Sequence, residues 1–347
     1  MRFYTGQHQY YCGIDLHARS MYICILNQAG EVLLHRDLPA GPEPFLRAVA
    51  PYRENLAVAV ECIFTWYWLA DLCAREGIAF VLGHALYMKA IHGGKAKNDK
   101  IDAHKIAAIL RGGMLAQAYV YPPRMRATRD LLRRRNHLVR KRAELLAHIQ
   151  NTNSQYNLPE FGTKLGRKSN REGLGERFTD PCVRRSIELD VALIDVYDEK
   201  LHALEYHLVR TAQAHDPNAF VLLRSVPGIG EILALVMLYE IETIGRFEKV
   251  GNFLSYARLV KCARESAGKC YGTGGNKIGN VHLRWAFGEA ACLFLRNNPP
   301  GQAYHQRLVN QYGKSKALSI IAQKLGRAVY VLLKRKEMFD MKKFLQG

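Results

Sequence analysis

Hydrophobic residues near the start of the chain alternate with polar ones in three short runs. These runs are Tyr10 to Asp15, Met21 to Leu26 and Val32 to His35, and turn-forming residues such as those at 27–30 separate them. Alternation with a period of two, interrupted by turns, is typical of strands that follow one another directly. The pattern therefore predicts a three-stranded meander.

The pattern then changes to helices that alternate with strands. Helical spacing covers about 43–51 and 66–76, while the apolar runs Leu56 to Val60 and Ile78 to Leu82 suit buried strands. Two more helices follow. Three strands and then alternating helix and strand is the order of the ribonuclease H-like α/β fold. We therefore expect residues 1–121 to form one α/β domain of this type.

A basic helix is predicted from Pro122 to Ile149. Leucines recur every seven residues, at Leu131, Leu138 and Leu145, which gives a narrow apolar seam. Only Asp130 and Glu144 oppose its many cations. These cations are Arg124, Arg126, Arg129, Arg133, Arg134, Arg135, Arg140, Lys141 and Arg142.

A second heptad helix follows an irregular segment. Residues 151–180 are rich in Gly, Asn, Ser and Lys and lack periodicity, so we expect a loop or an irregular insertion there. Residues 122–215 are predicted to form a helical connector, either a helical hairpin or dimerising coiled coil or an ordinary amphipathic pair packed on its own domain. The seam residues of the second helix are Ile187, Ile194, Leu201 and Leu208, with Asp190 interrupting them.

Residues 216–347 are expected to form a third, mainly helical unit. It begins with Val226-Pro227-Gly228-Ile229-Gly230 and a long apolar helix from Ile232 to Ile241. This turn and helix resemble half of a helix-hairpin-helix, in which a glycine turn brings backbone N–H groups close to a DNA phosphate. Gly228 and Gly230 are therefore predicted to contact nucleic acid.

The charge of the chain adds a partner to this picture. Fifty Lys and Arg residues against 31 Asp and Glu give a formal net charge of +19, which favours a polyanion such as nucleic acid. The eight cysteines show no metal-binding spacing, so we expect reduced thiols, most of them in the core. No long apolar run indicates a signal peptide or a membrane span, so we expect a cytoplasmic protein that does not bind membranes.

Four acids fall at positions where this fold could gather them. Asp15 ends the first predicted strand and Glu61 follows the fourth, and these two strands are parallel neighbours in such a fold. Asp99 and Asp102 begin a helix and share one of its faces. Four converging carboxylates repel one another unless cations lie between them, and Mg²⁺, as a pair of ions, suits oxygen ligands and phosphodiester chemistry. Mn²⁺ is a second possibility. Each acid alone could instead be a helix cap or a surface charge.

A glycine-rich segment in the last third of the chain contains a candidate nucleophile. Residues 264–280 combine Ser266 with five glycines and the cations Arg264, Lys269 and Lys277. Glycines allow close approach to a phosphate, and the cations can neutralise it. Spacing alone favours a turn-forming serine over a nucleophile, since no local His or Asp forms a triad with Ser266.

Five segments together resemble one known family. They are GIDLHARS at Asp15, VAVEC at Glu61, KNDKIDAHKIA at Asp99 and Asp102, SVPGIGEILA, and ESAGKCYGTGGNKIGNVHLR. Over almost the whole chain, these segments are similar to the transposases of the IS110/IS1111 insertion sequences and the related pilin-gene invertases. The sequence differs from the usual family pattern at Ser266, where it reads S-A-G-K instead of the more usual S-G-G-K. Cys270-Tyr271 also occupy positions where basic residues are common.

The resemblance implies a RuvC-like domain, a coiled-coil connector and a C-terminal transposase domain. It makes Asp15, Glu61, Asp99 and Asp102 the metal-binding acids and Ser266 the serine that joins covalently to DNA. It also implies donor and target DNA, a structured guide RNA encoded beside the gene, and a dimer or tetramer in which two protomers combine their catalytic halves. The remaining cations expected to contact nucleic acid are Arg133, Arg134, Arg135, Arg140, Lys141, Arg142 and Arg284.

The leading hypothesis is therefore a Mg²⁺-dependent, RNA-guided serine recombinase that inserts and excises its own element. Three alternatives stay open. The acids could act alone with water in a nuclease or junction resolvase. The chain could be a site-specific DNA invertase. It could also be a non-catalytic nucleic-acid-binding protein that functions through its basic helix.

Overall fold

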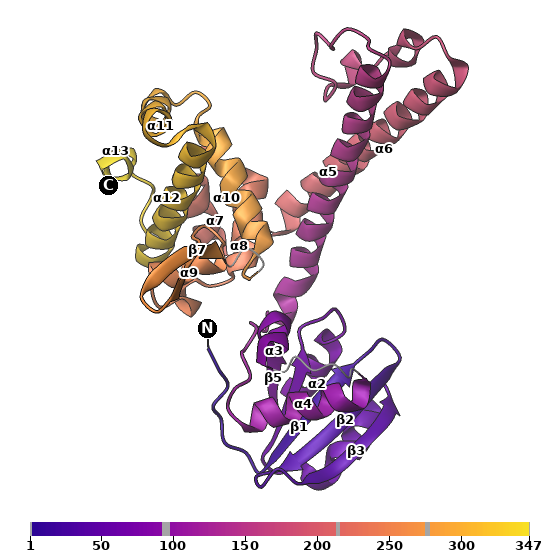
Figure 1. Ribbon diagram of the computed structural model, residues 1–347, viewed down its shortest axis with the longest axis vertical. Helices are drawn as coiled ribbons and strands as arrows, with labels where there is room; N and C mark the ends of the chain where they lie inside the picture. The colour runs from indigo at the N-terminus through magenta and orange to yellow at the C-terminus, as the bar shows by residue number, and fades with distance from the viewer. Residues whose placement is uncertain (1, 92–97, 213–215, 275–277, 347) are drawn as a thin grey trace. The chain divides into compact units, whose positions relative to one another are not determined.

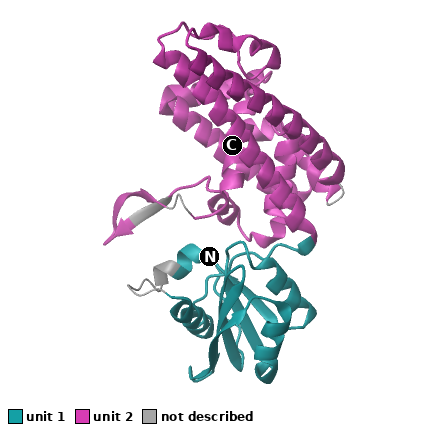
Figure 2. Ribbon diagram, turned by 90° about the vertical axis from the view of Figure 1, so that its right-hand side faces the viewer, with its two compact units in different colours: residues 1–123 teal, residues 124–347 magenta. Residues whose placement is uncertain are grey.

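The computed structural model describes residues 2–91, 98–212, 216–274 and 278–346, and the chain divides into two compact units. One unit is Met1–Pro123 and the other is Arg124–Gly347 (Figure 2). This division lies close to the predicted boundary between residues 121 and 122. The further boundary between residues 215 and 216 stays a prediction.

The first unit is built on a five-stranded mixed sheet with the order β3-β2-β1-β4-β5 (Figure 1). The pairs β1–β2 and β2–β3 are antiparallel, whereas β1–β4 and β4–β5 are parallel. The strands are β1 Tyr10–Leu16, β2 Ser20–Asn27, β3 Val32–Pro39, β4 Leu56–Glu61 and β5 Ala79–Gly83. The predicted meander and both later strands are confirmed, and this mixed sheet is consistent with a ribonuclease H-like domain.

Helices cover both faces of this sheet. On one face, α1 (Pro42–Val49) and α2 (Tyr67–Arg75) pack on the side chains of even-numbered β1 residues such as Cys12 and Ile14. On the other face, α4 (Asp99–Arg111) packs on Tyr11 and on neighbouring strands. The remaining helical segments of this unit are η1 Ala50–Tyr52 and α3 Ala85–Ile91. The central strand β4 is thus buried on both of its faces, which explains its continuous apolar run.

The second unit begins with a long antiparallel helical hairpin of α5 (Pro123–Gln155) and α6 (Pro181–Ala212) (Figure 1). Three polar pairs link the two helices: Arg135 with Glu205, Arg142 with Asp198, and His148 with Asp190. Residue numbers rise along α5 while they fall along α6, so the pairs fix an antiparallel register. The α6 seam is confirmed, because Ile187, Ile194, Leu201 and Leu208 are all buried. Dimerisation through a coiled coil stays a prediction.

The segment at the tip of the hairpin is irregular, as predicted, except that residues 151–155 continue α5. It contains two short helical turns, η2 Lys168–Asn170 and η3 Leu174–Arg177. Arg171 is only 2% exposed and donates to the Leu165 carbonyl (2.9 Å), Asp195 (2.5 Å) and Asp198 (2.7 Å). Burial tends to raise the pKa of Asp198, but hydrogen bonds from Arg142 and Arg171 outweigh it and lower that pKa. These hydrogen bonds of the buried Arg171 connect the segment at the tip of the hairpin to α6.

The rest of the second unit packs around α8, in which every residue from Leu233 to Ile241 is buried. The central position of α8 explains why its sequence is apolar on all sides. The helical elements of this part are α7 Pro217–Arg224, α8 Glu231–Ile241, η4 Ile244–Arg246, α9 Val250–Tyr256, α10 Val281–Phe294, α11 Pro299–Tyr312, α12 Lys314–Arg335 and α13 Met341–Gln346. A two-stranded ribbon, β6 Cys262–Ser266 with β7 Lys269–Gly274, lies between α9 and α10 in sequence.

One buried carboxylate links three parts of this unit. Glu240 on α8 accepts hydrogen bonds from Arg129 (3.0 Å) and Arg133 (2.6 Å) on α5. It also accepts one from Asn280 (2.7 Å), whose side chain caps α10 by accepting from two backbone N–H groups. Burial would raise the pKa of Glu240, but its cationic and amide partners lower that pKa to about 2. Glu240 is therefore charged and fully partnered, and it joins α5, α8 and the start of α10.

Two expectations drawn from composition can be compared with the structure. The seven described cysteines are all free, but four of them are exposed, so the expectation that most lie in the core is wrong. The exposed ones are Cys62, Cys182, Cys270 and Cys292. Among the helices of the described residues, none is both long enough and apolar enough to cross a membrane.

Glu240→Gln is expected to destabilise the second unit by about 3–5 kcal/mol, because it leaves two buried or half-buried arginines without their carboxylate. The depressed pKa means that this stabilisation is fully present above about pH 4.5 and is lost as the pH falls toward about 2. Urea unfolding at several pH values measures both effects. Glu231→Gln, on the same helix and in an exposed pair with Arg224, should cost no more than about 1 kcal/mol. Equal losses for the two variants would contradict the role given to Glu240.

Candidate active site

The alternation of side chains along the strands places two of the predicted acids on the same face of the sheet. Tyr11 on β1 and Ala59 on β4 contact the α4 side, so Asp15 and Glu61, an even number of residues further on, face that side too. The parallel register pairs Ile14 with Val60. Asp15 and Glu61 therefore occupy the next position on adjacent strands, at the edge where both strands end.

Helix α4 brings the other two acids to this edge. Its N-terminus is capped by Asn98, whose side chain accepts from the N–H of Ile101 at 2.8 Å, so that Asp99 and Asp102 lie in the first turn. The helix can lie this close to β1 because residue 13 is glycine. A Cβ at Gly13 would overlap the backbone of Ala103 and Ala107. Gly13 therefore sets the distance between the acids of α4 and those of the sheet.

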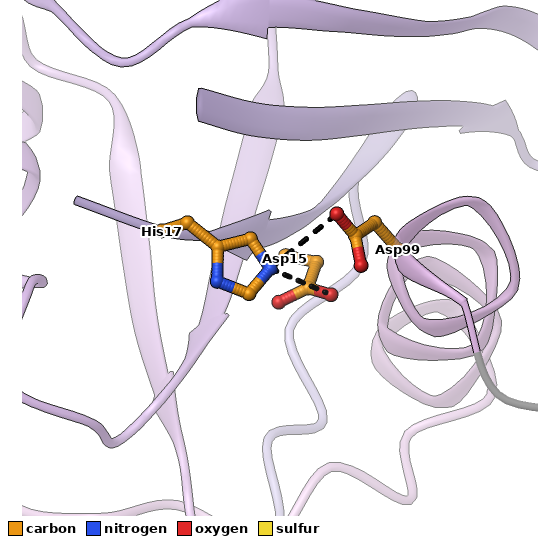
Figure 3. Close-up of side chains that lie close together, drawn as sticks. All are labelled: Asp15, His17 and Asp99. Carbon is orange, nitrogen blue, oxygen red and sulfur yellow. Dashed lines mark ion pairs between the residues drawn. The ribbon is translucent and has the colours of Figure 1, made fainter. Parts of the chain in front are cut away.

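The side chains at this edge point toward one another. The His17 Nε2 atom lies 3.6 Å from an oxygen of Asp15 and 3.5 Å from an oxygen of Asp99 (Figure 3). One ligand atom from each of these three residues lies within 4.8 Å of the others. Sequence reasoning missed His17, although it stands two residues after Asp15 in the GIDLHARS segment. One histidine two residues after an acid is not a recognisable metal-binding pattern in the sequence. The position of His17 next to both acids becomes apparent only in the fold.

Asp15 interacts electrostatically with each of the three other acids, although Glu61 and Asp102 are not among the residues whose ligand atoms lie within 4.8 Å of one another. Burial is the main cause that raises the pKa of Asp15, and His17 lowers it. Repulsion from Asp99, Asp102 and Glu61 raises it further. Asp102 has a cation near it, since the Lys105 Nζ atom lies 3.7 Å away. An excess of negative charge thus remains at this edge, and oxygen-binding divalent cations fit such a site. The catalytic roles of the four acids stay predictions.

Ser266 lies in the second unit, at the end of a ribbon where the sequence indicated a glycine-rich loop. It is exposed and pairs directly with Lys269 across a two-residue turn. The turn residues Ala267 (φ 50°) and Gly268 (φ 73°) both have left-handed backbones, as expected for a tight hairpin turn. Because Ala267 is not a glycine, its left-handed backbone carries some strain.

The glycines of the VPGIG turn have different surroundings. Gly228 has a φ of 86°, and a Cβ there would lie 2.5 Å from the Phe294 nitrogen and 2.7 Å from the Ala290 carbonyl oxygen of α10. This glycine thus allows α10 to pack on the turn. Gly230 is exposed at the start of α8, with no atom near the place of its missing Cβ. A phosphate contact stays a prediction for both, and the geometry favours Gly230.

The predicted nucleic-acid cations fall into two groups. Arg133, Arg135 and Arg142 donate to carboxylates of the same unit, so they stabilise the helical hairpin and its contact with α8. Arg134, Arg140, Lys141, Lys269 and Arg284 are exposed, although Lys141 pairs with Glu144 at 2.8 Å. The side chain of Arg264 and the whole of Lys277 lie outside the described residues. A contact with nucleic acid stays a prediction for every member of this set.

Comparison with known proteins decides the family. A transposase model of the DEDD IS110 type matches residues 12–157, and a model described as the IS116/IS110/IS902 transposase family matches residues 221–306. The chain is 23% identical over 339 residues to the transposase for insertion sequence element IS1111A of Coxiella burnetii (strain RSA 493 / Nine Mile phase I). This alignment covers 94% of the chain and 90% of that protein. The chain belongs to the IS110/IS1111 family of insertion-sequence transposases.

The two family matches together include both candidate chemical centres. The first match contains the strands and the helix that carry the four acids, and the second contains the VPGIG turn and the Ser266 ribbon. A transposase acts on DNA, and the family of DEDD transposases implies the use of divalent metal. The acid site at the sheet edge is a possible place for that metal.

Gly13→Ala is expected to disturb the acid site without altering any acid. The added methyl group overlaps the α4 backbone, so α4 must move away from β1, and Asp99 and Asp102 move with it. We expect Mn²⁺ affinity to fall at least tenfold and stability to fall by about 1–3 kcal/mol, measured by calorimetric titration and by urea unfolding.

Gly41→Ala is the matched control, because its backbone is extended and the nearest atom, on Pro44, lies 3.6 Å from the new Cβ. Unchanged Mn²⁺ binding in the Gly13→Ala variant would show that the position of α4 does not control the site.

Proposed function

We propose that this transposase is a divalent-metal-dependent DNA recombinase that inserts and excises its own insertion sequence through two chemical centres, the acid site and Ser266. The observation that supports this most directly is the gathering of acids from β1, β4 and α4 at one sheet edge. Asp15 is only half-buried there, yet it interacts with Asp99, Asp102 and Glu61. Such a concentration of like charge destabilises the protein unless a cation compensates it.

The acid site suits a pair of Mg²⁺ ions. Asp15, Glu61, Asp99 and Asp102 supply carboxylate oxygens, which are the ligands that hard divalent ions prefer. When bound, such ions stabilise charge on the attacking and leaving oxygens of a phosphodiester. The chain itself supplies the positions: β1 and β4 end side by side, and Asn98 fixes the first turn of α4.

Ser266 is the proposed nucleophile. Its hydroxyl oxygen forms a bond to the phosphorus of a DNA strand, and the bond from phosphorus to one deoxyribose oxygen breaks. That oxygen leaves as a hydroxyl group with the proton that the serine gives up, and attack by another strand's hydroxyl reverses the step and frees the serine. Ser266 is exposed at the end of the ribbon, so a DNA backbone can reach it. Lys269, which pairs with Ser266, can neutralise the DNA phosphate.

Among the side chains of the ribbon that the structure describes, Glu265 is the only carboxylate. Glu265 pairs with Cys270 and so lies on the opposite face of the ribbon from Ser266. The proton acceptor for Ser266 must therefore come from elsewhere, and we place it in the acid site, supplied by the same or a second protomer. This requirement favours a homo-oligomer in which the two centres meet on DNA.

Guidance by a structured RNA completes the proposal. After the 31 carboxylates are counted, the chain keeps a formal net charge of +19, and Arg134 and Arg140 have exposed guanidinium groups on α5. Exposed cations on a helix suit the phosphates of RNA or DNA without reading their sequence. We assign the choice of donor and target sites to the RNA, and we place the reaction in the cytoplasm.

Ser266→Ala should reduce recombination at least about a thousandfold in a plasmid assay that supplies the element with its native flanks. It should also abolish any covalent protein–DNA adduct detected after denaturation, because the phosphoserine bond cannot form. Asp15→Asn should abolish both readouts as well, and Ser319→Ala, an exposed serine on α12, should change neither.

Recombination that persists in Ser266→Ala would remove this serine from the mechanism. Free strand breaks that depend on Asp15 but not on Ser266 would instead favour a nuclease or junction resolvase, in which the acids act with water.

A further inference from the structure

His17 occupies the place between two acids where a cation would lie. Its Nε2 atom is 3.6 Å from Asp15 and 3.5 Å from Asp99 (Figure 3). The residue sits on a fixed backbone, since it follows directly on β1 and its N–H donates to the Ser20 carbonyl at 2.9 Å across the turn to β2. Its side chain is half-exposed, so an ion from solvent can reach it.

The distances match the spacing of ligands around one ion. Two ligand atoms that each lie about 2.1 Å from a metal are roughly 3.0–3.4 Å apart in octahedral or tetrahedral geometry. The two nitrogen–oxygen separations exceed this range by only a few tenths of an ångström, and the oxygens of Asp15 and Asp99 lie within 4.8 Å of each other. A small rotation of side chains would therefore place one nitrogen and two carboxylate oxygens around a single cation.

We propose that His17 is a nitrogen ligand of one ion in the acid site, and that it makes this position prefer Mn²⁺ to Mg²⁺. The inference rests on the metal site of the proposed function. Mg²⁺ selects oxygen ligands and gives up water reluctantly, whereas first-row transition ions bind imidazole well. A position with one imidazole therefore differs from a site made of carboxylates alone.

The test is Mn²⁺ binding to the purified full-length protein. Pulsed electron paramagnetic resonance of bound Mn²⁺ should show coupling to a nitrogen-14 nucleus, and His17→Ala should remove this coupling. Calorimetric titration should show about a tenfold or larger loss of Mn²⁺ affinity in His17→Ala, with a smaller change for Mg²⁺. His35→Ala is the matched control, because His35 lies beside the first turn of α4 and its Nε2 atom is 3.0 Å from the Lys100 carbonyl oxygen.

The outcomes separate this inference from the function on which it rests. Unchanged nitrogen coupling or unchanged Mn²⁺ affinity in His17→Ala would overturn the role of His17 while leaving the acid site intact. Failure of the unmodified protein to bind either ion, or full binding by Asp15→Asn, would overturn the acid site itself. A loss of the coupling in His35→Ala would assign the nitrogen ligand to another residue.

A separate observation concerns the segment that joins β4 to α2. Phe64 is 82% exposed, which is unusual for so large an apolar side chain, and it lies three residues after Glu61. Before Phe64 the segment is anchored by Cys62, whose N–H donates to the Gly83 carbonyl at 2.9 Å, and after Phe64 it is anchored by the next two residues. Thr65 donates from Oγ1 to the Leu16 carbonyl at 3.0 Å, beside Asp15 and His17, and Trp66 is buried in the core of the first unit. Phe64 is thus exposed on a segment that begins after Glu61 and contacts the strand that carries Asp15.

We infer that Phe64 is a wedge that inserts between DNA bases next to the strand held at the acid site. Apolar side chains that enter a base step unstack it partly and bend the duplex, which exposes the backbone. The anchored segment fits this use, because a wedge must keep its position while it displaces a base. The partner is double-stranded DNA, and the inference depends on the acid site but not on Ser266.

Fluorescence of 2-aminopurine tests the wedge. The probe replaces single bases, one at a time, around the exchange point in a duplex of the joined element ends, with the flanking RNA present. Binding of the full-length protein should raise the fluorescence at one step through unstacking, and Phe64→Ala should abolish that rise while Phe64→Leu retains it. Val32→Ala, which removes an exposed apolar side chain from β3, should leave the rise unchanged.

Mn²⁺ titration of Phe64→Ala is the accompanying control and should match that of the unmodified protein. An unchanged fluorescence rise in Phe64→Ala, or no rise at any probed step with the unmodified protein, would overturn the wedge. Recombination by Ser266→Ala would instead overturn the proposed nucleophile and would leave the wedge standing.

Discussion

The close contact between α4 and β1 is the constraint on which the candidate site depends. A helix that packs on a sheet normally keeps its backbone away from the strands by the thickness of the side chains between them. Gly13 removes one of those side chains, and the small residues Ala103 and Ala107 of α4 face it, so the two backbones meet directly. The first turn of α4 then reaches the end of β1. Two acids from a helix and two from a sheet come together for this reason.

Repulsion among these acids destabilises the arrangement, and the apolar packing of α4 offsets this repulsion. The four acids repel one another, and His17 and Lys105 compensate them only in part. Behind the acids, Ile106, Ile109 and Leu110 of α4 are buried against the sheet. Burial of such side chains contributes about 1.5–3 kcal/mol each, so α4 stays in place although its first turn is repelled. The charge that remains is available to a cation.

Two carboxylates in this protein show how the same chemical group serves different purposes. Glu240 is buried among arginines and an asparagine, and its pKa falls to about 2, so its charge is satisfied within the protein. Asp15 is less buried, yet burial raises its pKa, and repulsion from Asp99, Asp102 and Glu61 raises it further while His17 lowers it. The first arrangement stabilises the fold. The second arrangement leaves negative charge that the surrounding side chains do not fully neutralise, which is typical of functional sites. The same distinction separates the paired Arg133 and Arg142 from the exposed Arg134 and Arg140 on α5.

The sequence by itself determined the order of strands and helices in the first unit, the α6 seam and the places of the four acids along the chain. Side-chain periodicity and capping are local properties, so they can be read from neighbouring residues. Only the tertiary structure decided what those residues contact. It gave Gly228 a packing role against α10 and showed a ribbon where the sequence indicated a loop at Ser266. It paired arginines of α5 with acids 56 to 111 residues away. It also made His17 part of the acid site. Contacts between distant segments depend on how layers pack in space, and no local pattern of residues contains that information.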